Sequence, residues 1–398
     1  MPSPDSSSSL RLVAILGSTG SIGTNALDVI RHFPDRLAVH TLVAHSNVKL
    51  LAEQCHEFKP STAIITCSKA LETLDRSAFP GETTLLSGVD AVLKAVEHSD
   101  VDTVLSAVVG AAGLHGTWAA VAAGKTVAIA NKETLVVAGP LILALAAKSG
   151  ATLLAVDSEH SAIAQALTGH TAKDISRVVL TGSGGPFRGK SASELSDATP
   201  EQALKHPTWQ MGAKISIDSA TLMNKALEVI EARWLFALSP EQIDVIIHPE
   251  SIVHSFVEFV DGSVLAQLSP PDMRLPIQLA LLHPHRIAGP AKRLDWRTLS
   301  HLRFEAPDHD TFPALGLGFE AARNGGTCGA VLNAANEVAV EAFLNHRLDF
   351  LNIAKSVKTV LSEHAYEPAP TLERLLALDA WARQEVDRWI TCHHQTRR

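Results

Sequence analysis

The stretch RLVAILGSTGSIG, residues 11 to 23, decides the fold. Its first six residues form an apolar run typical of a buried parallel strand, and a helical pattern follows at residues 25–32. Gly17, Gly20 and Gly23 form a turn between the two. Glycines let the backbone approach a pyrophosphate, and the start of the helix supplies N–H donors. The stretch therefore predicts a dinucleotide site, although the GxxGxxG spacing also occurs in purely structural turns.

Strands and helices continue to alternate up to residue 156. Apolar runs predict further strands at residues 38–44, 62–66, 103–109, 127–130 and 153–156. Helical stretches such as residues 89–97 separate these runs, as in a doubly wound, Rossmann-like α/β sheet. We therefore predict a nucleotide-binding domain over residues 10–156, after a disordered Pro/Ser-rich tail at residues 1–9.

The rest of the chain divides into three further regions. An α+β catalytic and dimerisation domain is predicted over residues 157–282, with strands at 178–181, 245–247, 251–259 and 263–268 and a long helix at 221–236. Residues 283–318 contain four prolines and little periodicity, which indicates a linker. Helical patterns from residue 319 onwards predict a C-terminal helical bundle over residues 319–398.

The composition of the chain limits its partners and its location. Lys and Arg number 34 and Asp and Glu 42 among 398 residues, so the net charge is −8 and argues against nucleic acid or an anionic membrane. The most membrane-like stretch, residues 104–123, is broken by glycines and His115, so no span is expected. The four cysteines have no paired spacing. This favours a reducing compartment, the cytoplasm, or a plastid if a transit peptide has been removed.

The end of the second predicted strand indicates which dinucleotide binds. Enzymes that use NAD usually place Asp or Glu here to bind the ribose 2′-hydroxyl. This chain has His45, Ser46 and Asn47 instead, which can donate to a 2′-phosphate. NADPH is therefore favoured over NADH. The alternative is that these residues only form a polar turn.

A polar triplet follows the strand predicted at residues 127–130. Asn131, Lys132 and Glu133 stand where the carboxyl ends of parallel strands face the ligand. Lys132 can place a cation against a substrate oxygen. The alternative is a solvated loop in which Asn131 caps a helix.

Two carboxylates follow the strand predicted at residues 153–156. Asp157 and Glu159 are two residues apart, so in an extended chain they point the same way and converge. A divalent cation relieves their repulsion, and oxygen ligands favour Mg²⁺ or Mn²⁺ over zinc. The alternative is a helix start in which Asp157 or Ser158 is the cap.

The helix predicted at residues 221–236 carries polar groups in its early turns. Asn224 and Glu228 are four residues apart and share a face, with Lys225 beside them. Glu228 is therefore the candidate for a third metal ligand. Glu231 lies three residues further on and competes with it, and spacing alone does not separate the two.

A second glycine turn, TGSGGPF at residues 181–187, also follows a predicted strand. Its amides and Ser183 can hold a phosphate. The segment HPTWQMG, residues 206–212, follows in a stretch of low periodicity. Trp209 and Met211 can cap a closed site, or Trp209 can simply cover the edge of the core.

Together these segments resemble the 1-deoxy-D-xylulose 5-phosphate reductoisomerase family over residues 11 to about 390. The resemblance rests on GSTGSIG at 17–23, NKE at 131–133, VDSEH at 156–160, TGSGGPF at 181–187, HPTWQMGAKISIDSATLMNKALE at 206–228, HPESIVHS at 248–255, DGSVLAQLSPPDMR at 261–274 and LNAANE at 332–337. It implies a homodimeric enzyme of the methylerythritol phosphate route to isoprenoids. Such an enzyme isomerises and reduces a small sugar phosphate with NADPH and a divalent metal.

The resemblance also implies roles for individual residues. It implies that the metal ligands are Asp157, Glu159 and Glu228, and it therefore favours Glu228 over Glu231. The catalytic set comprises these three with Lys132 and His206. The substrate contacts are Ser158, Glu159, Ser183, His206, Trp209, Ser219, Asn224, Lys225 and Glu228. Among them, the phosphate falls to Ser183, Ser219, Asn224 and Lys225, and the mobile lid to His206 and Trp209.

The NADPH contacts implied by the family are Thr19, Gly20, Ser21, Ile22, Asn131 and Glu133. The predicted cofactor site is completed by Gly17, Ser18, His45, Ser46, Asn47, Lys132 and Gly212. In some members of the family a basic residue stands at the position of Ser46. The preference for NADPH over NADH is therefore expected to be weaker here.

The reaction implied by the family begins with metal chelation of the substrate carbonyl and its adjacent hydroxyl. The carbon skeleton rearranges, by retro-aldol and aldol steps or by another route, and NADPH reduces the resulting aldehyde to 2-C-methyl-D-erythritol 4-phosphate. Two other classes compete with this interpretation. A semialdehyde dehydrogenase needs a nucleophilic cysteine beside a base, which no segment here suggests. A nucleotide-sensing regulator would need neither the carboxylates nor the lid.

Overall fold

The computed structural model describes residues 10–396, and the chain divides into two compact units. The first unit comprises residues up to 131 together with residues 144–157 and 272–292. The second comprises residues 132–143, 158–271 and those from 293 onwards. The tail predicted at residues 1–9 lies outside the described residues, and the finer division into four regions remains a prediction.

A parallel sheet forms the centre of the first unit. Its seven strands within the described residues have the order β4-β3-β2-β1-β5-β6-β7, and every neighbouring pair is parallel. The strands are β1 Arg11–Leu16, β2 Leu37–Ala44, β3 Thr62–Ile65, β4 Thr84–Ser87, β5 Thr103–Ser106, β6 Thr126–Ile129 and β7 Thr152–Ala155. This confirms the Rossmann-like fold. The mostly exposed edge strand β4 was not predicted, because its residues lack an apolar run.

Helices connect these strands. They are α1 Ser21–His32, α2 Val48–Phe58, α3 Ser68–Glu72, α4 Val89–Glu97, α5 Leu114–Ala122 and α6 Lys132–Ser149. Helix α6 is interrupted at Ala138, whose φ is −135°. Its first residues, 132–143, belong to the second unit and the rest to the first.

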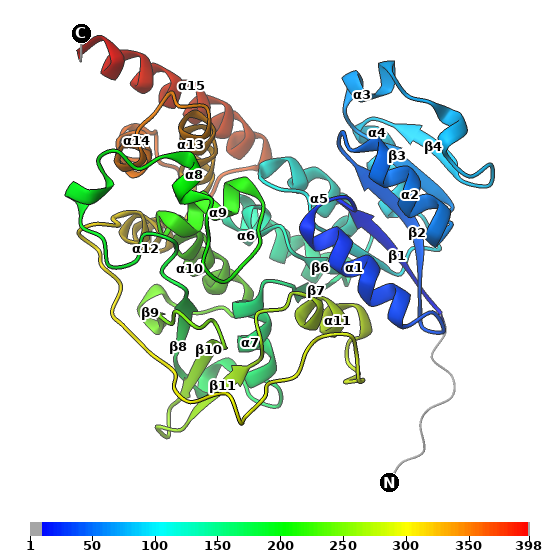
Figure 1. Ribbon diagram of the computed structural model, residues 1–398, viewed down its shortest axis with the longest axis horizontal. Coiled ribbons are helices and arrows are strands. Elements are labelled where there is room, and N and C mark those ends of the chain that lie inside the picture. The colour runs from blue at the N-terminus through cyan, green and yellow to red at the C-terminus, as the bar shows by residue number, and fades with distance from the viewer. Residues whose placement is uncertain (1–9, 397–398) are drawn as a thin grey trace. The chain divides into compact units, whose positions relative to one another are not determined.

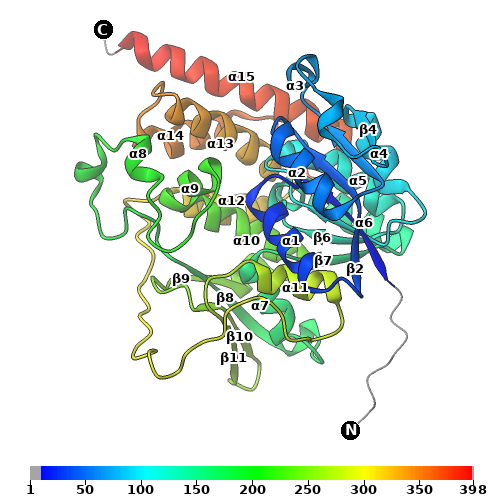
Figure 2. The ribbon, with the colours of Figure 1, turned by 45° about the vertical axis from the view of Figure 1, so that its right-hand side comes forward.

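Residues 272–292 return to the first unit and carry helix α11, Arg274–Leu282. Helix α11 lies beside α1 in both ribbon views (Figures 1 and 2). Arg11 Nη1 donates to the carbonyl oxygen of Leu281 at 2.6 Å, and Arg274 Nη1 donates to Asp28 Oδ2 at 2.9 Å. The sequence did not predict this return, because no local pattern links residues about 250 positions apart.

The second unit contains a mixed sheet. Its four strands, in the described part of the chain, have the order β11-β10-β8-β9. They are β8 Ile175–Gly182, β9 Ile243–Ile247, β10 Val253–Phe259 and β11 Val264–Leu268. Strands β8 and β9 are parallel, and β10 is antiparallel to both β8 and β11. Helix α7, Ser158–Ala166, packs against β10 and β11.

The helix predicted at residues 221–236 corresponds to α10 in the structure, and the helix before it, α9, was not predicted. Helix α9 spans Ala213–Ala220 and α10 spans Met223–Leu235, and the short helix α8 precedes them at Pro200–Ala203. Leu222, between α9 and α10, has a φ of +61°. This left-handed conformation is unusual for leucine and ends α9. As a result, α10 has its own N-terminus, beside Asn224 and Lys225.

Helices near the C-terminus share the core of the second unit. They are α12 Ala314–Asn324, α13 Cys328–Leu344, α14 Phe350–Glu363 and α15 Leu372–Thr396. Helix α13 packs against both α14 and α15 (Figures 1 and 2), and α12 packs against α10. One hydrophobic cluster includes Leu180 of the sheet, Leu227 of α10 and Phe343 of α13. The helical region is therefore continuous with the core around the sheet.

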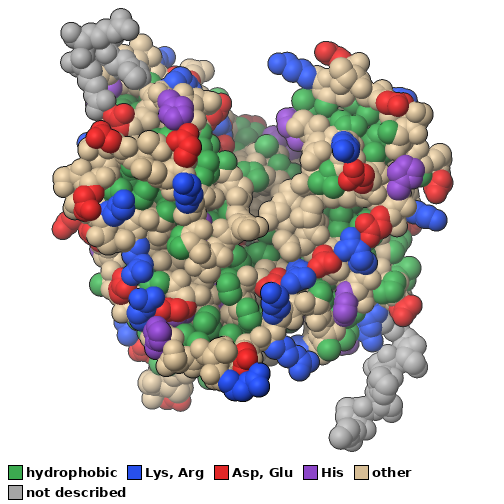
Figure 3. All heavy atoms as spheres, in the orientation of Figure 1, with side chains coloured by type: hydrophobic (Ala, Val, Ile, Leu, Met, Phe, Trp, Pro, Cys, Tyr) green, Lys and Arg blue, Asp and Glu red, His purple; other side chains and the backbone are tan. Residues whose placement is uncertain are grey.

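None of the helices within residues 10–396 is both long enough and apolar enough to cross a bilayer. Acidic and basic side chains are interspersed on the face drawn in Figure 3.

Candidate functional site

The glycine turn after β1 has a backbone path that only glycine fits. Gly17 has a φ of +92°, and a Cβ there would lie 2.6 Å from the carbonyl oxygen of Ala107. A Cβ at Gly23 would overlap the carbonyl oxygen of Gly17. These two glycines bring the end of β1, the loop after β5 and the start of α1 into close contact, as a Rossmann turn requires.

The start of α1 offers unused N–H donors to a ligand. Gly20 is the N-cap of α1, and no side chain of the described residues accepts a hydrogen bond from the first amides of this helix. The first turn of α1 contains no acidic residue. Gly20 and Ser21 are exposed, whereas Ser18 is fully buried. This exposed helix start, with its positive partial charge, fits a pyrophosphate.

The residues after β2 are exposed, as a ribose site needs. His45, Ser46 and Asn47 all lie on the surface of the first unit. Asn47 caps α2, because its Oδ1 accepts from the amide of Leu50 at 3.2 Å. His45 Nδ1 lies 3.0 Å from Thr66 Oγ1. The polar-turn alternative therefore describes Asn47, while Ser46 is exposed.

Asn131 holds the loop that follows β5. Its Nδ2 donates to the carbonyl oxygens of Val108 and Gly110, at 2.5 and 2.9 Å. It is 1% exposed, and a Cβ at Gly113 would lie 2.9 Å from its Cγ. Asn131 thus fixes the backbone on the edge of the sheet where Gly17 also lies.

Four charged side chains meet in the second unit. Lys225 of α10 donates from Nζ to Glu159 Oε1 of α7 at 2.7 Å, and it also contacts Glu228 Oε2. Lys132 Nζ, from the start of α6, lies 3.1 Å from Glu228 Oε1. Glu228 is fully buried, and both lysines are nearly so. Burial lowers the pKa of Lys225, but the two carboxylates outweigh this and raise it, so the ammonium stays charged.

Neutral polar groups complete this cluster. Asn224 Oδ1 accepts from Lys132 Nζ at 2.9 Å, and Asn224 Nδ2 donates to Glu228 Oε1 at 2.5 Å. Ser158 Oγ donates to Glu159 Oε2 at 2.5 Å. The structure therefore brings together residues that the sequence predicted separately from α6, α7 and α10.

Asp157 is the last residue of the first unit and directly precedes α7. Ligand atoms of Asp157, Glu159 and Glu228 lie within 4.8 Å of one another, and so do those of Asp157, His160 and Glu231. His160 Nδ1 lies 3.3 Å from Glu231 Oε2, and its Nε2 lies 3.0 Å from the carbonyl oxygen of Glu228. Glu231 therefore pairs with a histidine that sequence reasoning missed, whereas Glu228 faces Glu159.

The predicted phosphate residues surround the start of α10. Gly185 has a φ of +68°, and a Cβ there would lie 2.6 Å from the carbonyl oxygen of Ser219. A Cβ at Gly182 would lie 3.1 Å from Lys225 Cε. Among the described residues, no side chain caps the start of α10, and the first turn of α10 contains no acidic residue. Backbone amides, hydroxyls and one ammonium therefore meet at a helix start, a favourable environment for an anion.

His206 is bonded so that one ring nitrogen faces Ser183. Its Nδ1 accepts from the amides of Thr208 and Trp209, at 3.1 and 2.9 Å. In the neutral ring the proton is then on Nε2, which donates to Ser183 Oγ at 2.8 Å. Burial lowers the pKa of His206, which favours this neutral form. The partly exposed ring of Trp209 lies with its centroid 6.4 Å from that of His254.

A buried charge network, which the sequence did not reveal, holds Glu133. Lys214 Nζ lies 2.6 Å from Glu133 Oε1 and 2.9 Å from Asp218 Oδ2, and Asn336 Nδ2 donates to Asp218 Oδ1 at 2.8 Å. Burial opposes the charge of Glu133, but Lys214 outweighs it and lowers the pKa of that carboxyl. Gly212, the predicted cofactor contact nearby in sequence, is the exposed N-cap of α9.

Family models match most of the chain. The model for 1-deoxy-D-xylulose 5-phosphate reductoisomerase matches residues 13–139, and two models for C-terminal domains of this enzyme match residues 153–236 and 268–385. The reductoisomerase of Chlorobium chlorochromatii is 52% identical over 382 residues, covering 96% of this chain and all of that relative. The chain belongs to the 1-deoxy-D-xylulose 5-phosphate reductoisomerase family. The reductoisomerase of Chloroherpeton thalassium is 50% identical over 95% of this chain and 97% of its own length.

Solved reductoisomerases have the same fold. The enzyme of Zymomonas mobilis in complex with NADPH is 44% identical, with a TM-score of 0.89 over 96% of this chain and 99% of its own. A reductoisomerase in complex with NADPH, fosmidomycin and magnesium is 42% identical, with a TM-score of 0.91 over 97% of this chain and 100% of its own. The predicted family, fold class and enzyme class are confirmed. The semialdehyde dehydrogenase and the regulator are therefore set aside.

Proposed function

We propose that this protein isomerises and reduces 1-deoxy-D-xylulose 5-phosphate to 2-C-methyl-D-erythritol 4-phosphate, with NADPH and Mg²⁺ or Mn²⁺. The observation that carries the proposal is the buried cluster of Glu159, Glu228 and Lys225 beside the phosphate-like nest at the start of α10. Oxygen ligands next to an anion site suit a substrate with a carbonyl and hydroxyl at one end and a phosphate at the other. Relatives in complex with NADPH and magnesium support the choice of cofactors.

NADPH is assigned to the glycine turn of the first unit, and it supplies the hydride for the reduction. The amides at Ser21 and Ile22 would hold the pyrophosphate, because α1 begins there without a side-chain cap in the described chain. The exposed Ser46 and His45 would face the 2′-phosphate. Asn131 supports this site by fixing the loop after β5.

The metal is assigned to Asp157, Glu159 and Glu228. A divalent ion held there would polarise the substrate carbonyl as a Lewis acid. Glu228 suits a ligand because Asn224 and Lys132 bind one of its oxygens and fix its orientation. Glu231 suits the role less well, because His160 already pairs with it.

The substrate is assigned to the side chains around this cluster. Ser183, Ser219, Asn224 and Lys225 would bind the phosphate with hydroxyl, amide and ammonium donors. His206 would donate from Nε2, the nitrogen that now donates to Ser183. Lys132 and Ser158 would contact the sugar backbone, and Trp209 would cover the bound substrate and exclude water. Phosphate binding would thus supply the energy that closes the lid.

Two further properties are proposed on the strength of the family resemblance. The protein would act as a homodimer through the second unit. It would work in the cytoplasm.

The direct test is a spectroscopic assay of NADPH oxidation with 1-deoxy-D-xylulose 5-phosphate. Oxidation should require both the substrate and Mg²⁺ or Mn²⁺, and the product should be 2-C-methyl-D-erythritol 4-phosphate by mass spectrometry and NMR. Oxidation that is unaffected by a chelator, or a product with an unbranched skeleton, would refute the proposal.

A further inference from the structure

A second cluster of metal-binding residue types lies in the first unit. His40 is in β2, His98 directly follows α4, and Asp100 is in the turn before β5. The amide of Asp102 donates to the carbonyl oxygen of Leu12 at 3.0 Å, so this turn lies where β1 begins. The glycine turn follows the other end of β1. The cluster and the proposed nucleotide site are therefore at opposite ends of the same strand.

His40 stands at an irregularity in the sheet. Val39 pairs with Val13 and Thr41 pairs with the next residue, Ala14, so His40 is an extra residue on β2. A bulge of this kind is rare between parallel strands and re-aims the side chain at the bulge. The register of the central strand pair is thus broken at the residue that contributes an imidazole to the cluster.

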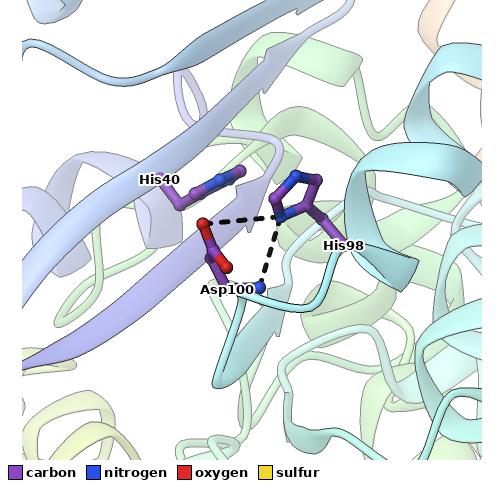
Figure 4. A group of neighbouring side chains, drawn as sticks. All are labelled: His40, His98 and Asp100. Atoms are coloured by element: carbon purple, nitrogen blue, oxygen red, sulfur yellow. Dashed lines mark hydrogen bonds and ion pairs between the residues drawn. The ribbon is translucent and has the colours of Figure 1, made fainter.

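The three side chains converge on one point. Ligand atoms of His40, His98 and Asp100 all lie within 4.8 Å of one another. The two imidazole rings face each other with centroids 4.9 Å apart, and the carboxylate lies beside them (Figure 4). His40 is 7% exposed, whereas the side chains of His98 and Asp100 are 51% and 63% exposed. The cluster therefore has a buried base and an open side that solvent can reach.

Neighbouring groups orient the candidate ligands. His40 Nδ1 lies 2.9 Å from Oγ1 of the buried Thr41, which leaves Nε2 as the nitrogen for a ligand. His98 Nδ1 accepts from the amide of Asp100 at 3.2 Å, a long contact that a metal could replace. Lys125 Nζ donates to the carbonyl oxygens of His98 and Val101, at 2.6 and 2.7 Å, and fixes the backbone of the turn. A bonded second ring nitrogen, as in His40, is typical of metal-binding histidines.

The charges nearby act in both directions. Burial lowers the pKa of His40, and the neighbouring His98 lowers it further, so the neutral ring needed for metal binding is favoured. The ammonium of Lys125 opposes an added cation, whereas Asp100 and the net charge of −8 favour one. The site should therefore bind a metal less tightly than a fully buried structural site.

We propose that His40, His98 and Asp100 bind a divalent transition metal ion of the zinc type. Two imidazoles and one carboxylate are typical zinc ligands, and the open side leaves a position for water. The proposed carboxylate site of this protein shares no residue with the cluster and offers only oxygen ligands, which suit Mg²⁺. A bound ion would join β2 to the turn before β5, and these two strands flank β1 on either side. It would thereby stabilise the nucleotide-binding unit.

The test is calorimetric titration of the untagged protein with Zn²⁺ in excess Mg²⁺, which keeps the oxygen site occupied. The exposed Cys392 and His393 offer other zinc ligands, so Cys392→Ser is the reference protein. The reference should bind one equivalent of Zn²⁺. His98→Ala should lower the affinity for this ion by at least about 100-fold, because loss of a mere outer-shell partner already costs roughly 10- to 100-fold. His56→Ala, on helix α2 of the same unit, should bind Zn²⁺ like the reference.

Two further measurements guard against misfolding and non-specific binding. Without zinc, His98→Ala should unfold at the same temperature as the reference protein, because the His98 side chain is half exposed. Added Zn²⁺ should then raise the unfolding temperature of the reference protein but not that of the variant. Co²⁺ bound to the reference should show the intense visible absorption of a nitrogen-ligated, low-coordinate ion, and His40→Gln and Asp100→Asn should lose it. Equal zinc affinity in His98→Ala and His56→Ala would overturn the proposal.

Discussion

Glu228 is the residue whose substitution tests the proposed metal site most directly. Asn224 and Lys132 donate to its Oε1, and Lys225 contacts its Oε2. The change Glu228→Gln keeps the shape of the side chain but removes one charge. The two lysines and the carboxylates of Asp157, Glu159 and Glu228 sum to −1 in the wild type and to zero in the variant. The variant site therefore attracts a divalent cation less strongly.

The loss of metal affinity expected for Glu228→Gln can be estimated from the effect of removing residues that contact a metal ligand but not the metal. Loss of an outer-shell partner typically costs about 10- to 100-fold in metal affinity or activity. Glu228 is a direct ligand in the proposal and also carries charge, so Mg²⁺ should bind at least about 100-fold more weakly, or about 2.8 kcal/mol. At limiting metal, kcat/KM should fall by at least the same factor. NADPH affinity should change little, because the glycine turn belongs to the other unit.

The assay combines Mg²⁺ titration by calorimetry with steady-state kinetics over a wide range of metal concentration. Glu231→Gln is a matched control, because it is the same substitution on the same helix at a residue that is also buried. Its amide oxygen can still accept from His160, so we expect less than about a tenfold loss, one hydrogen bond being worth about 1 kcal/mol. If Glu231→Gln weakens metal binding as much as Glu228→Gln does, the ligand assignment is wrong.

Four further outcomes are expected. Lys225→Ala should raise KM and lower kcat, reducing kcat/KM roughly 10- to 150-fold for a lost charged hydrogen bond of about 1.5–3 kcal/mol; wild-type kinetics would remove Lys225 from the site. NADPH should have a higher kcat/KM than NADH, and Ser46→Arg should widen that ratio roughly tenfold; an unchanged ratio would place the 2′-phosphate elsewhere. Ligand should alter tryptophan emission and protease cleavage within residues 184–213, and Trp209→Phe should lose most of the emission change, whereas a rigid loop would show neither effect. Burial raises the pKa of Glu250, but hydrogen bonds from Arg303 outweigh burial and hold this pKa at about 2. The resulting stabilisation of the fold is present above pH 4.5 and is lost as the pH falls towards 2. Glu250→Gln should therefore lower the unfolding temperature by about 2–4 °C at pH 7 and by less at pH 3.

The features that sequence reasoning predicted correctly are those that a short segment determines. Strand β1, the glycine turn and α1 follow each other without interruption, and the geometry at Gly17 and Gly23 excludes any side chain. The pattern of the residues therefore determines the conformation. Strands β2, β3, β5, β6 and β7 were predicted for the same reason, because each strand is a local apolar run.

The features that were missed depend on long-range contacts or on an unusual conformation. Arg274 binds Asp28 across 246 positions, and this contact anchors α11 in the first unit. The left-handed conformation of Leu222, where the predicted helix begins, was not predicted because leucine rarely adopts a positive φ. The pairing of His160 with Glu231 required the folded arrangement of α7 and α10. Spacing along the chain contains none of this information.

The charge balance of the cluster in the second unit explains why its metal and phosphate functions belong together. Lys132, Glu159, Lys225 and Glu228 are largely buried and sum to zero, so each charge is compensated by a neighbour. A buried charge without a partner is strongly unfavourable. A phosphate monoester carries a charge of about −1.5 to −2 at pH 7. A divalent cation and such a phosphate therefore leave the sum of charges at the site nearly unchanged when they enter together, whereas either one alone leaves uncompensated charge beside buried carboxylates or ammoniums.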